Sequence, residues 1–172
     1  MFDADILFAA HREGVFRYLC RIVSPADARE LTQEVFLRVT RGPVPDADRS
    51  ARRAWIFRIA RNLALNHLRD AGRRGPNVEL PDVAVSATQE AAAALREALE
   101  GLAELDRDVF LMREVGGLSY DEIAVACELT GDAVRSRLHR ARQQLRQTLG
   151  PVVRSHWASR PVRLYDRRTR DE

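Results

Sequence analysis

Cysteine, aromatic residues and lysine are scarce or missing in this sequence of 172 residues. It has two cysteines and 6% aromatic residues, and all 28 basic residues are arginine. Cys20 and Cys127 lie far apart, each within an apolar helical pattern, so we expect two core thiols and no disulfide framework. The four histidines are isolated from one another and from the cysteines, so no metal site is expected.

Long apolar runs are missing too. None approaches the roughly 18 residues that a membrane-spanning helix needs, and the start "MFDADILFAA" is acidic where a secretory signal would be basic. We therefore expect a cytoplasmic protein without membrane insertion. Ala, Leu, Arg and Glu dominate over β-branched residues, which favours helices. The composition predicts an all-α fold with almost no sheet.

Charge changes sign along the chain. Residues 49–74 contain eight arginines and one acid, and residues 75–106 contain seven acids and one arginine. Arginine is again in excess over 131–149. The stretch "RRGPNVELPDVAVSATQE" (73–90) has glycine, two prolines and no helical period. The pattern predicts two small helical domains, 1–72 and 91–149, joined by a flexible linker, 73–90. The basic tail, 150–172, is expected to be disordered.

Three amphipathic helices are predicted in the first domain. The second should span about 26–41 and the third about 50–71, and the third carries many arginines outside its apolar stripe. On each helix, apolar residues at helical spacing should face the core. They are Phe8, Val15, Leu19 and Ile22 on the first helix, Leu31, Val35 and Val39 on the second, and Trp55, Ile59 and Leu63 on the third.

The second domain has sharper signals for helix starts. A helix over about 87–105 and a short one around "RDVFLMREV" should precede them. Ser119 is followed by Glu122 three residues on, which is the spacing of a capping box. Thr130 is a second candidate N-cap. Because only a tight turn separates the two helices, the pattern predicts a helix-turn-helix.

The last helix, "DAVRSRLHRARQQLRQTL", has two faces. Val134, Leu138, Ala141 and Leu145 form its core stripe, and polar side chains occupy the opposite arc. Such a face fits the major groove, where Arg binds guanine and Gln or Ser reaches other base edges. A solvated arginine face is the alternative, and the tandem caps favour DNA binding. We expect base contacts from Ser136, His139, Arg140 and Gln143, and phosphate contacts from Arg135, Arg137 and Arg142.

Three motifs together resemble a known family. "GLSYDEIAVACELTGDAVRSRLHRARQQL" resembles the C-terminal helix-turn-helix of bacterial sigma factors. "DARELTQEVFLRV" and "WIFRIARNLALNHLRD" resemble their N-terminal promoter-melting domain. The motif order and the linker are similar to those of the extracytoplasmic-function group of the sigma-70 superfamily. The resemblance covers about residues 5–149.

The resemblance implies partners and roles for particular residues. The helix "DARELTQEVFLRV" would dock on the clamp helices of the RNA polymerase largest subunit, and the second domain would meet the flap and read the duplex −35 element. The residues implied for the clamp are Asp27, Glu30, Gln33, Glu34 and Arg38. Asn62, with the basic residues Arg53, Arg58 and Arg61, would bind the single-stranded −10 element, since an unstacked base needs a polar pocket and its backbone needs positive charge.

The sequence departs from the family pattern in two places. The loop "RGPVPDADRSARR" has no aromatic residue to stack on a flipped base, so the −10 preference is not carried over. In the helix-turn-helix, Glu128 stands where the family often has glycine, and Asp132 places an acid near the phosphates.

The sequence thus predicts a transcription initiation factor that binds core RNA polymerase and promoter DNA. It predicts no catalytic residues, no cofactor and no enzymatic activity, because no nucleophile, carboxylate pair or metal cluster converges in the motifs. An anti-sigma protein is the further partner that the resemblance implies. The competing hypotheses are a repressor or activator that binds duplex DNA without polymerase, and a helical adaptor that binds only protein.

Overall fold

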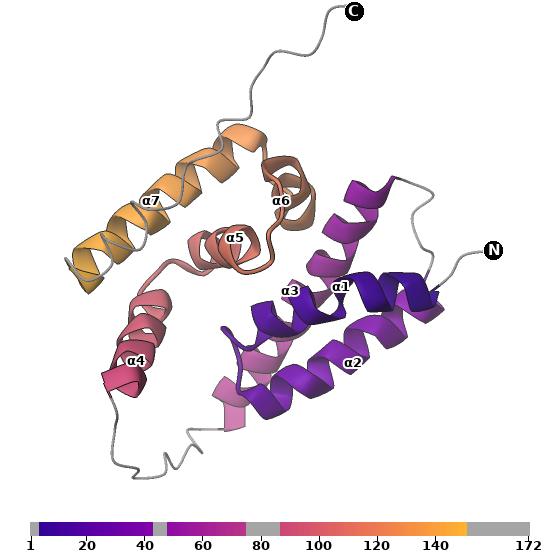
Figure 1. The fold of residues 1–172 in the computed structure, drawn as a ribbon, viewed down its shortest axis with the longest axis horizontal. Helices are drawn as coiled ribbons and strands as arrows, with labels where there is room; N and C mark the ends of the chain where they lie inside the picture. The colour runs from indigo at the N-terminus through magenta and orange to yellow at the C-terminus, as the bar shows by residue number, and fades with distance from the viewer. Residues whose placement is uncertain (1–3, 43–47, 75–86, 151–172) are drawn as a thin grey trace, which may run out of the picture.

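A computed structural model describes residues 4–42, 48–74 and 87–150, and within these ranges all regular structure is helical (Figure 1). These helices confirm the predicted all-α fold. Residues 43–47 of the loop without aromatic residues lie outside the described residues, and so does the tail beyond Gly150, for which disorder was predicted. The helices are α1 (Ala4–Leu19), α2 (Pro25–Arg41), α3 (Arg49–Arg74), α4 (Ala87–Glu100), α5 (Glu104–Glu114), α6 (Tyr120–Cys127) and α7 (Gly131–Leu149).

Helices α1, α2 and α3 pack on one another and form the first domain. The chain turns sharply before α2 because Pro25 suits the first helical position and the Ser24 hydroxyl accepts a hydrogen bond from the Asp27 backbone N–H. The buried side chains come from all three helices, and the largest are Tyr18, Leu19, Ile56, Phe57, Val15, Val35 and Val39.

The predicted apolar stripes are confirmed only in part on each helix, and on α2 Leu31 is half-buried. Val35 and Val39 are buried, whereas Phe8 is 39% exposed and packs edge-on against Phe36. On α3, Trp55 and Ile59 are only half-buried. The reason is that α3 packs against α1 and α2 on one side and α6 on another, so a wide arc is buried rather than one stripe. The buried apolar residues of α3 are Ala54, Ile56, Phe57, Ala60, Leu63, Ala64 and Leu65.

Helices α4 to α7 form the second domain, in which α7 contacts α4, α5 and α6. The capping box at Ser119 and the Thr130 N-cap are both present, which confirms the two predicted helix starts. Both helices predicted before the capping box are present, but the first ends earlier than expected: α4 stops at Glu100, and a short turn at Gly101 precedes α5. The core stripe predicted for α7 is buried, as expected.

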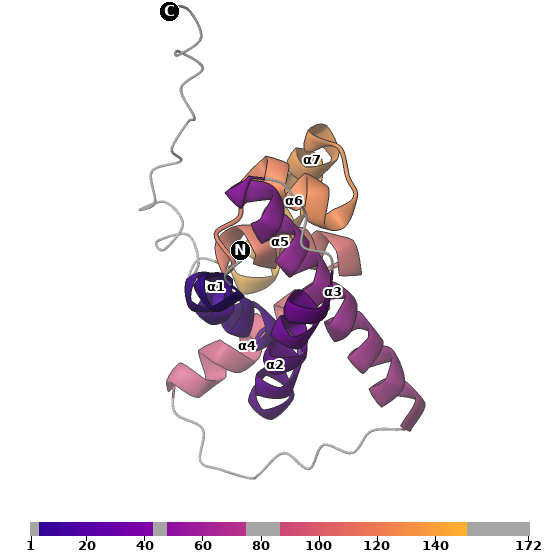
Figure 2. The ribbon, with the colours of Figure 1, turned by 90° about the vertical axis from the view of Figure 1, so that its right-hand side faces the viewer.

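The two domains are in contact, because α3 packs against α6 and one hydrophobic cluster runs through both domains (Figures 1 and 2). Gly116 lies in this contact, between Phe57 and Leu118. A Cβ atom at Gly116 would lie 2.8 Å from a Phe57 ring carbon, so the residue must be glycine for the domains to approach. Most of the predicted linker, residues 75–86, lies outside the described residues. At its two ends the predicted linker is helical, because α3 continues to Arg74 and α4 begins at Ala87.

Candidate nucleic-acid interface

Helix α7 presents the residues that the sequence predicted for base contacts. Ser136, His139, Arg140 and Gln143 are exposed, on the side opposite the buried stripe. Arg135 is exposed as well and pairs with Asp132, the acid one turn before it on the same helix. A rigid helix with polar side chains on one face can be placed in a major groove without any change in its own core.

Three other arginine contacts of α7 go to acids of α5, which the sequence did not predict. Asp106 accepts hydrogen bonds from Arg137 at 2.6 Å and from the Nε of Arg140 at 3.1 Å. Glu114 accepts one from Arg142 at 2.8 Å. Burial of Asp106 opposes its ionisation, but the hydrogen bonds and charges of Arg140 and Arg137 prevail and lower its pKa. Arg137 and Arg140 are therefore held in place from within their own domain.

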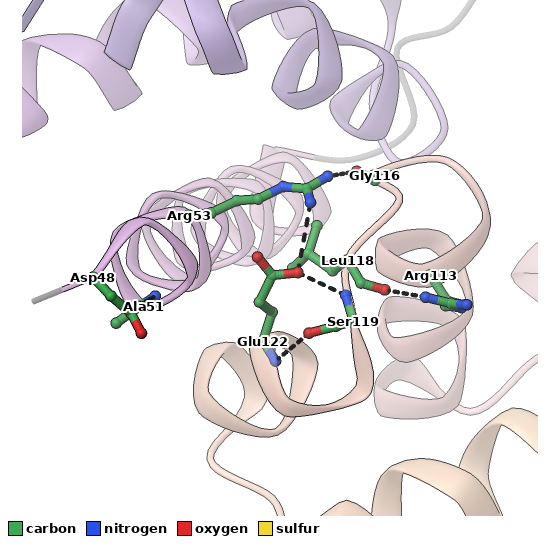
Figure 3. Close-up of polar contacts among 8 residues, drawn as sticks. All are labelled: Asp48, Ala51, Arg53, Arg113, Gly116, Leu118, Ser119 and Glu122. Carbon is green, nitrogen blue, oxygen red and sulfur yellow. Dashed lines mark hydrogen bonds and ion pairs between the residues drawn. The ribbon is translucent and has the colours of Figure 1, made fainter. Parts of the chain in front are cut away.

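Helix α3 brings together the arginines predicted for the −10 strand, and all three face the second domain. Arg53 donates a hydrogen bond to the Gly116 carbonyl at 2.5 Å and lies 3.5 Å from the Glu122 carboxylate (Figure 3). Arg58 lies 3.6 Å from Glu128. Each contact joins a basic residue of α3 to a group on α6 or on the turns beside it.

The third of these arginines makes the most deeply buried contact. The Nε of Arg61 donates a hydrogen bond to the Asp108 carboxylate at 2.6 Å, and the Asp108 side chain is only 2% exposed. Burial raises the pKa of Asp108, and the positive charge of Arg61 offsets part of that rise. Glu104 lies 4.0 Å from the same guanidinium. Arg61 thus compensates a charge that would otherwise be isolated in the protein interior.

Asn62, the fourth residue predicted for the −10 strand, is exposed on α3. Its amide can donate and accept hydrogen bonds, as base reading requires. The loop that would lie beside a captured base includes 43–47, which are outside the described residues. The structure therefore places the amide and the arginines on one helix but in different surroundings.

Helix α2 carries the five residues predicted for polymerase docking. Glu30, Gln33 and Arg38 are exposed, and Asp27 and Glu34 are half-buried. Glu34 accepts a hydrogen bond from the Nε of Arg38 at 2.7 Å. Sequence reasoning missed Leu37, which is 46% exposed between these polar side chains. The signal was present in the sequence, because Leu37 is a large aliphatic residue off the Leu31, Val35 and Val39 stripe.

Sequence reasoning also missed the acids that pair with the arginines. Glu122 was predicted only as the capping-box residue of α6, and it does accept a hydrogen bond from the Ser119 N–H at 2.6 Å. It also lies near Arg53, so one carboxylate serves the helix start and the domain contact (Figure 3). Asp106, Asp108, Glu114 and Glu128 have no sequence signal of their own, because acids on amphipathic helices ordinarily face solvent.

No helix among the described residues is long and apolar enough to cross a membrane. Within the same residues, no group of three or more His, Cys, Asp or Glu side chains lies close enough together to hold a metal ion. Cys127 is buried and Cys20 half-buried, and neither forms a disulfide.

A helix-turn-helix with an exposed polar face on its second helix defines a DNA-binding protein, and comparison with known proteins specifies which kind. Residues 7–74 match the Sigma-70 region 2 family and residues 92–145 match the Sigma-70, region 4 family. The chain is 30% identical to the RNA polymerase sigma-H factor of Pseudomonas aeruginosa, over 87% of this chain and 88% of that protein. It is also 30% identical to the ECF RNA polymerase sigma-E factor of Escherichia coli K12, with the same coverage of both proteins.

Solved structures share the fold. The sigma factor RpoE of Bartonella quintana, in complex with the anti-sigma factor NepR, has a TM-score of 0.65 at 20% identity, covering 84% of this chain and 95% of that one. CnrH, in complex with the cytosolic domain of CnrY, has a TM-score of 0.62 at 25% identity, covering 85% of this chain and 86% of that one. The chain belongs to the extracytoplasmic-function group of sigma-70 factors. It directs RNA polymerase to promoters and initiates transcription there.

Proposed function

We propose that the two domains divide promoter recognition between them, with region 2 spanning 1–72 and region 4 spanning 91–149. The observation that carries the proposal is the polar face of α7, where Ser136, His139, Arg140 and Gln143 are exposed opposite a fully packed stripe. That face reads the duplex −35 element in the major groove, and Arg135, Arg137 and Arg142 contact the flanking phosphates.

Helix α3 binds the single-stranded −10 element. Asn62 contacts a base edge, and Arg53, Arg58 and Arg61 neutralise the backbone. Support comes from their common location on one helix and from the exposure of Asn62. In the present arrangement the three arginines contact the second domain, so they become available to DNA only when that contact opens.

Helix α2 docks on core RNA polymerase. Asp27, Glu30, Gln33, Glu34 and Arg38 form its polar contacts, and we add Leu37 as the apolar centre of the surface. An exposed aliphatic side chain ringed by charged groups matches the usual composition of a protein interface, with an apolar centre and a polar rim. The surface is accessible because α2 packs with its other side on α1 and α3.

A pull-down with core polymerase, followed by run-off transcription, tests this assignment. Changing Gln33, Glu34 and Leu37 together to Ala should weaken polymerase binding at least tenfold, because such a change removes the centre of an interface. The matched control is Glu13→Ala with Arg17→Ala, an exposed i,i+4 pair on α1. Equal affinities for the two variants would refute the docking surface. Transcription from duplex DNA without polymerase binding would favour the repressor or activator hypothesis.

An inhibitory protein is the further partner we infer, since the structural relative RpoE was solved with the anti-sigma factor NepR. Because α3 and α6 are in contact here, an inhibitor that wedges between the domains must first separate them. Co-purification from uninduced cells tests this inference. Recovery with polymerase alone would argue against any inhibitor.

A further inference from the structure

One acid of α5 binds two arginines of α7 at once. Asp106 accepts hydrogen bonds from Nη1 of Arg137 at 2.6 Å, from Nε of Arg140 at 3.1 Å and from Nη2 of Arg140 at 3.3 Å. The Asp106 side chain is only 10% exposed, and the two arginines are neighbours on α7 because they are three residues apart. A single carboxylate therefore compensates two like charges that would otherwise repel each other.

The two arginines differ in their exposure to solvent. The side chain of Arg137 is 28% exposed and makes the shorter hydrogen bond, so it fastens the carboxylate to α7. The side chain of Arg140 is 58% exposed. Arg140 is therefore the one of the two that keeps most of its surface available to a ligand.

The pairing with Asp106 uses one edge of the Arg140 guanidinium. A guanidinium has five N–H donors in a planar fork, and Asp106 accepts from two of them, one on Nε and one on Nη2. Both N–H groups of Nη1 and the second one of Nη2 remain for another acceptor. Guanine presents O6 and N7 in the major groove, and an arginine fork can bind both at once. Asp106 thus leaves available the edge of Arg140 that guanine requires.

We propose that Asp106 is a positioning residue for base recognition, which holds the Arg140 guanidinium with its Nη1 and Nη2 edge free for guanine and so sets the base preference of α7 without contacting DNA. The inference rests on the proposed function, because it takes Arg140 as a base-reading residue for the −35 element. It adds a residue of α5, outside the helix-turn-helix, to the determinants of promoter choice.

Asp106 is held more firmly than the arginine that it positions. It lies in the first turn of α5, where the helix dipole favours a negative charge, and α5 packs directly on α7. Burial opposes the ionisation of Asp106, but its hydrogen bonds to Arg140 and Arg137 prevail and lower its pKa, so the carboxylate is charged at neutral pH. An arginine that is already ordered loses less conformational entropy when it binds a base. Asp106 therefore favours one geometry of Arg140 before DNA binds.

Other arginines of α7 pair with acids in a different way. Arg135 pairs with Asp132, whose side chain is 90% exposed on the same helix. Arg142 donates to Glu114 from Nη2 at 2.8 Å, so its contact uses an atom that a guanine would need. Among the described hydrogen bonds of the α7 arginines, the donor is Nε at Arg140 alone. This difference singles out Arg140 as the arginine that an acid can orient without blocking it.

The negative charge of Asp106 gives the positioning role a distinctive signature. A carboxylate beside a DNA-binding face repels phosphates and offsets part of the arginine charge there. Loss of the acid should free both arginines to follow phosphates, so binding to unrelated sequences should strengthen while the preference among bases declines. A purely structural role predicts a different result, because a loosened α7 would lose affinity for every sequence together with its preference.

Binding of the polymerase complex to a randomised −35 library at two salt concentrations measures both quantities. Asp106→Asn in the full chain should reduce the base preference at the position read by Arg140 severalfold. It should also raise affinity for unrelated sequences and steepen the salt dependence by about one unit. The matched control is Asp132→Asn, which removes an exposed acid that pairs within α7. The control should likewise raise affinity for unrelated sequences and leave the base preference as it is.

Two further variants test whether Asp106 acts through Arg140. In an Arg140→Ala background, Asp106→Asn should have no further effect on the base preference, because the side chain that the acid positions is gone. Arg140→Lys keeps the charge but has no fork, so it should lose the preference and retain affinity for unrelated sequences. Because Arg140 is exposed, this variant tests the geometry even if circular dichroism shows that Asp106→Asn fails to fold.

The outcomes separate this inference from the proposed function. An unchanged preference in Asp106→Asn, a joint fall of preference and general affinity in that variant when folded, additive losses in the double variant, or a full preference in Arg140→Lys would each overturn the positioning role. If Arg140→Ala kept the preference, Arg140 would not be a base-reading residue and the positioning role would fail with it. A preference lost in Arg140→Ala and kept in Asp106→Asn would leave the proposed function intact and remove Asp106 alone.

Discussion

Helices α3 and α7 are both rich in arginine, but the acids that pair with these arginines lie in different places. On α7, Arg137, Arg140 and Arg142 pair with acids of α5, within the same domain. On α3, the partners of Arg53 and Arg61 belong to the other domain. In the sequence both helices carry basic residues outside an apolar pattern, so the sequence alone does not distinguish them.

This difference decides which of the two basic surfaces keeps its arrangement when the domains move. The acids of α5 move with α7 and hold its arginines in one orientation whether or not the domains touch. The acids that meet α3 leave when the second domain leaves. The surface proposed for the −35 element is therefore preorganised, whereas the surface proposed for the −10 strand depends on the arrangement of the domains. Four sets of measurements test this comparison.

The largest effect is expected from Arg61→Ala. It leaves Asp108 buried without its ion pair, so the contact between α3 and the second domain should be destabilised by on the order of 3 kcal/mol. Urea unfolding measures the loss. Arg69→Ala is the control, an exposed arginine on the same helix, and should change stability by less than about 0.5 kcal/mol. Equal behaviour of the two variants would contradict the cross-domain role of Arg61.

The next effect concerns DNA selection by α7. Arg140→Ala should reduce affinity on the order of tenfold at the preferred −35 sequence and flatten the preference at one or two positions. Arg137→Ala should weaken binding to all sequences alike and reduce the salt slope by about one unit. Binding of the polymerase complex to a randomised −35 library at two salt concentrations distinguishes them. A uniform loss for Arg140→Ala would make α7 a phosphate clamp.

A smaller effect is expected from Asn62→Ala. Because Asn62 is exposed on α3 and outside the buried ion pair, its loss should impair strand opening severalfold and leave both the domain contact and duplex binding unchanged. Permanganate reactivity of thymines near −10 reports the opening. Normal reactivity would remove Asn62 from the proposed site.

The smallest effect is on the pH dependence of stability, to which His11 and Asp106 contribute in different pH ranges. Burial, and then the charges of Arg53 and Arg49, lower the pKa of His11 below its ordinary 6.5. The unfolded chain therefore binds the proton more readily, and stability should fall as the pH drops below 6.5. Asp106 has its pKa lowered below 3.8, so its contribution to stability is lost only as the pH falls below 3.8.

Urea unfolding at a series of pH values, on the unchanged protein and on His11→Asn, isolates the histidine. The raised pKa of Asp108 acts in the opposite sense above 3.8, and it is common to both proteins. The difference between them should therefore grow as the pH falls through the range below 6.5. Parallel curves would show that His11 binds its proton equally well in the folded and unfolded states.

The helix starts and the core of α7 were predicted from local chemistry. Ser119 with Glu122, and Thr130, cap helices because their side chains bond backbone groups three residues on, and this spacing is visible in the sequence. The stripe of Val134, Leu138, Ala141 and Leu145 follows from one helical period and one packed side. The failures on α3 have the opposite cause, since a helix packed on several sides has no single stripe to find.

The sequence by itself determined the helical fold class, the two caps of the helix-turn-helix and the family, because each depends on residues a few positions apart or on short motifs in order. Only the tertiary structure decided where each arginine's charge is compensated. Arg61 and Asp108 are 47 residues apart, and their 2.6 Å contact exists because α3 packs on the second domain. Long-range packing sets such a pairing, and no local spacing encodes it.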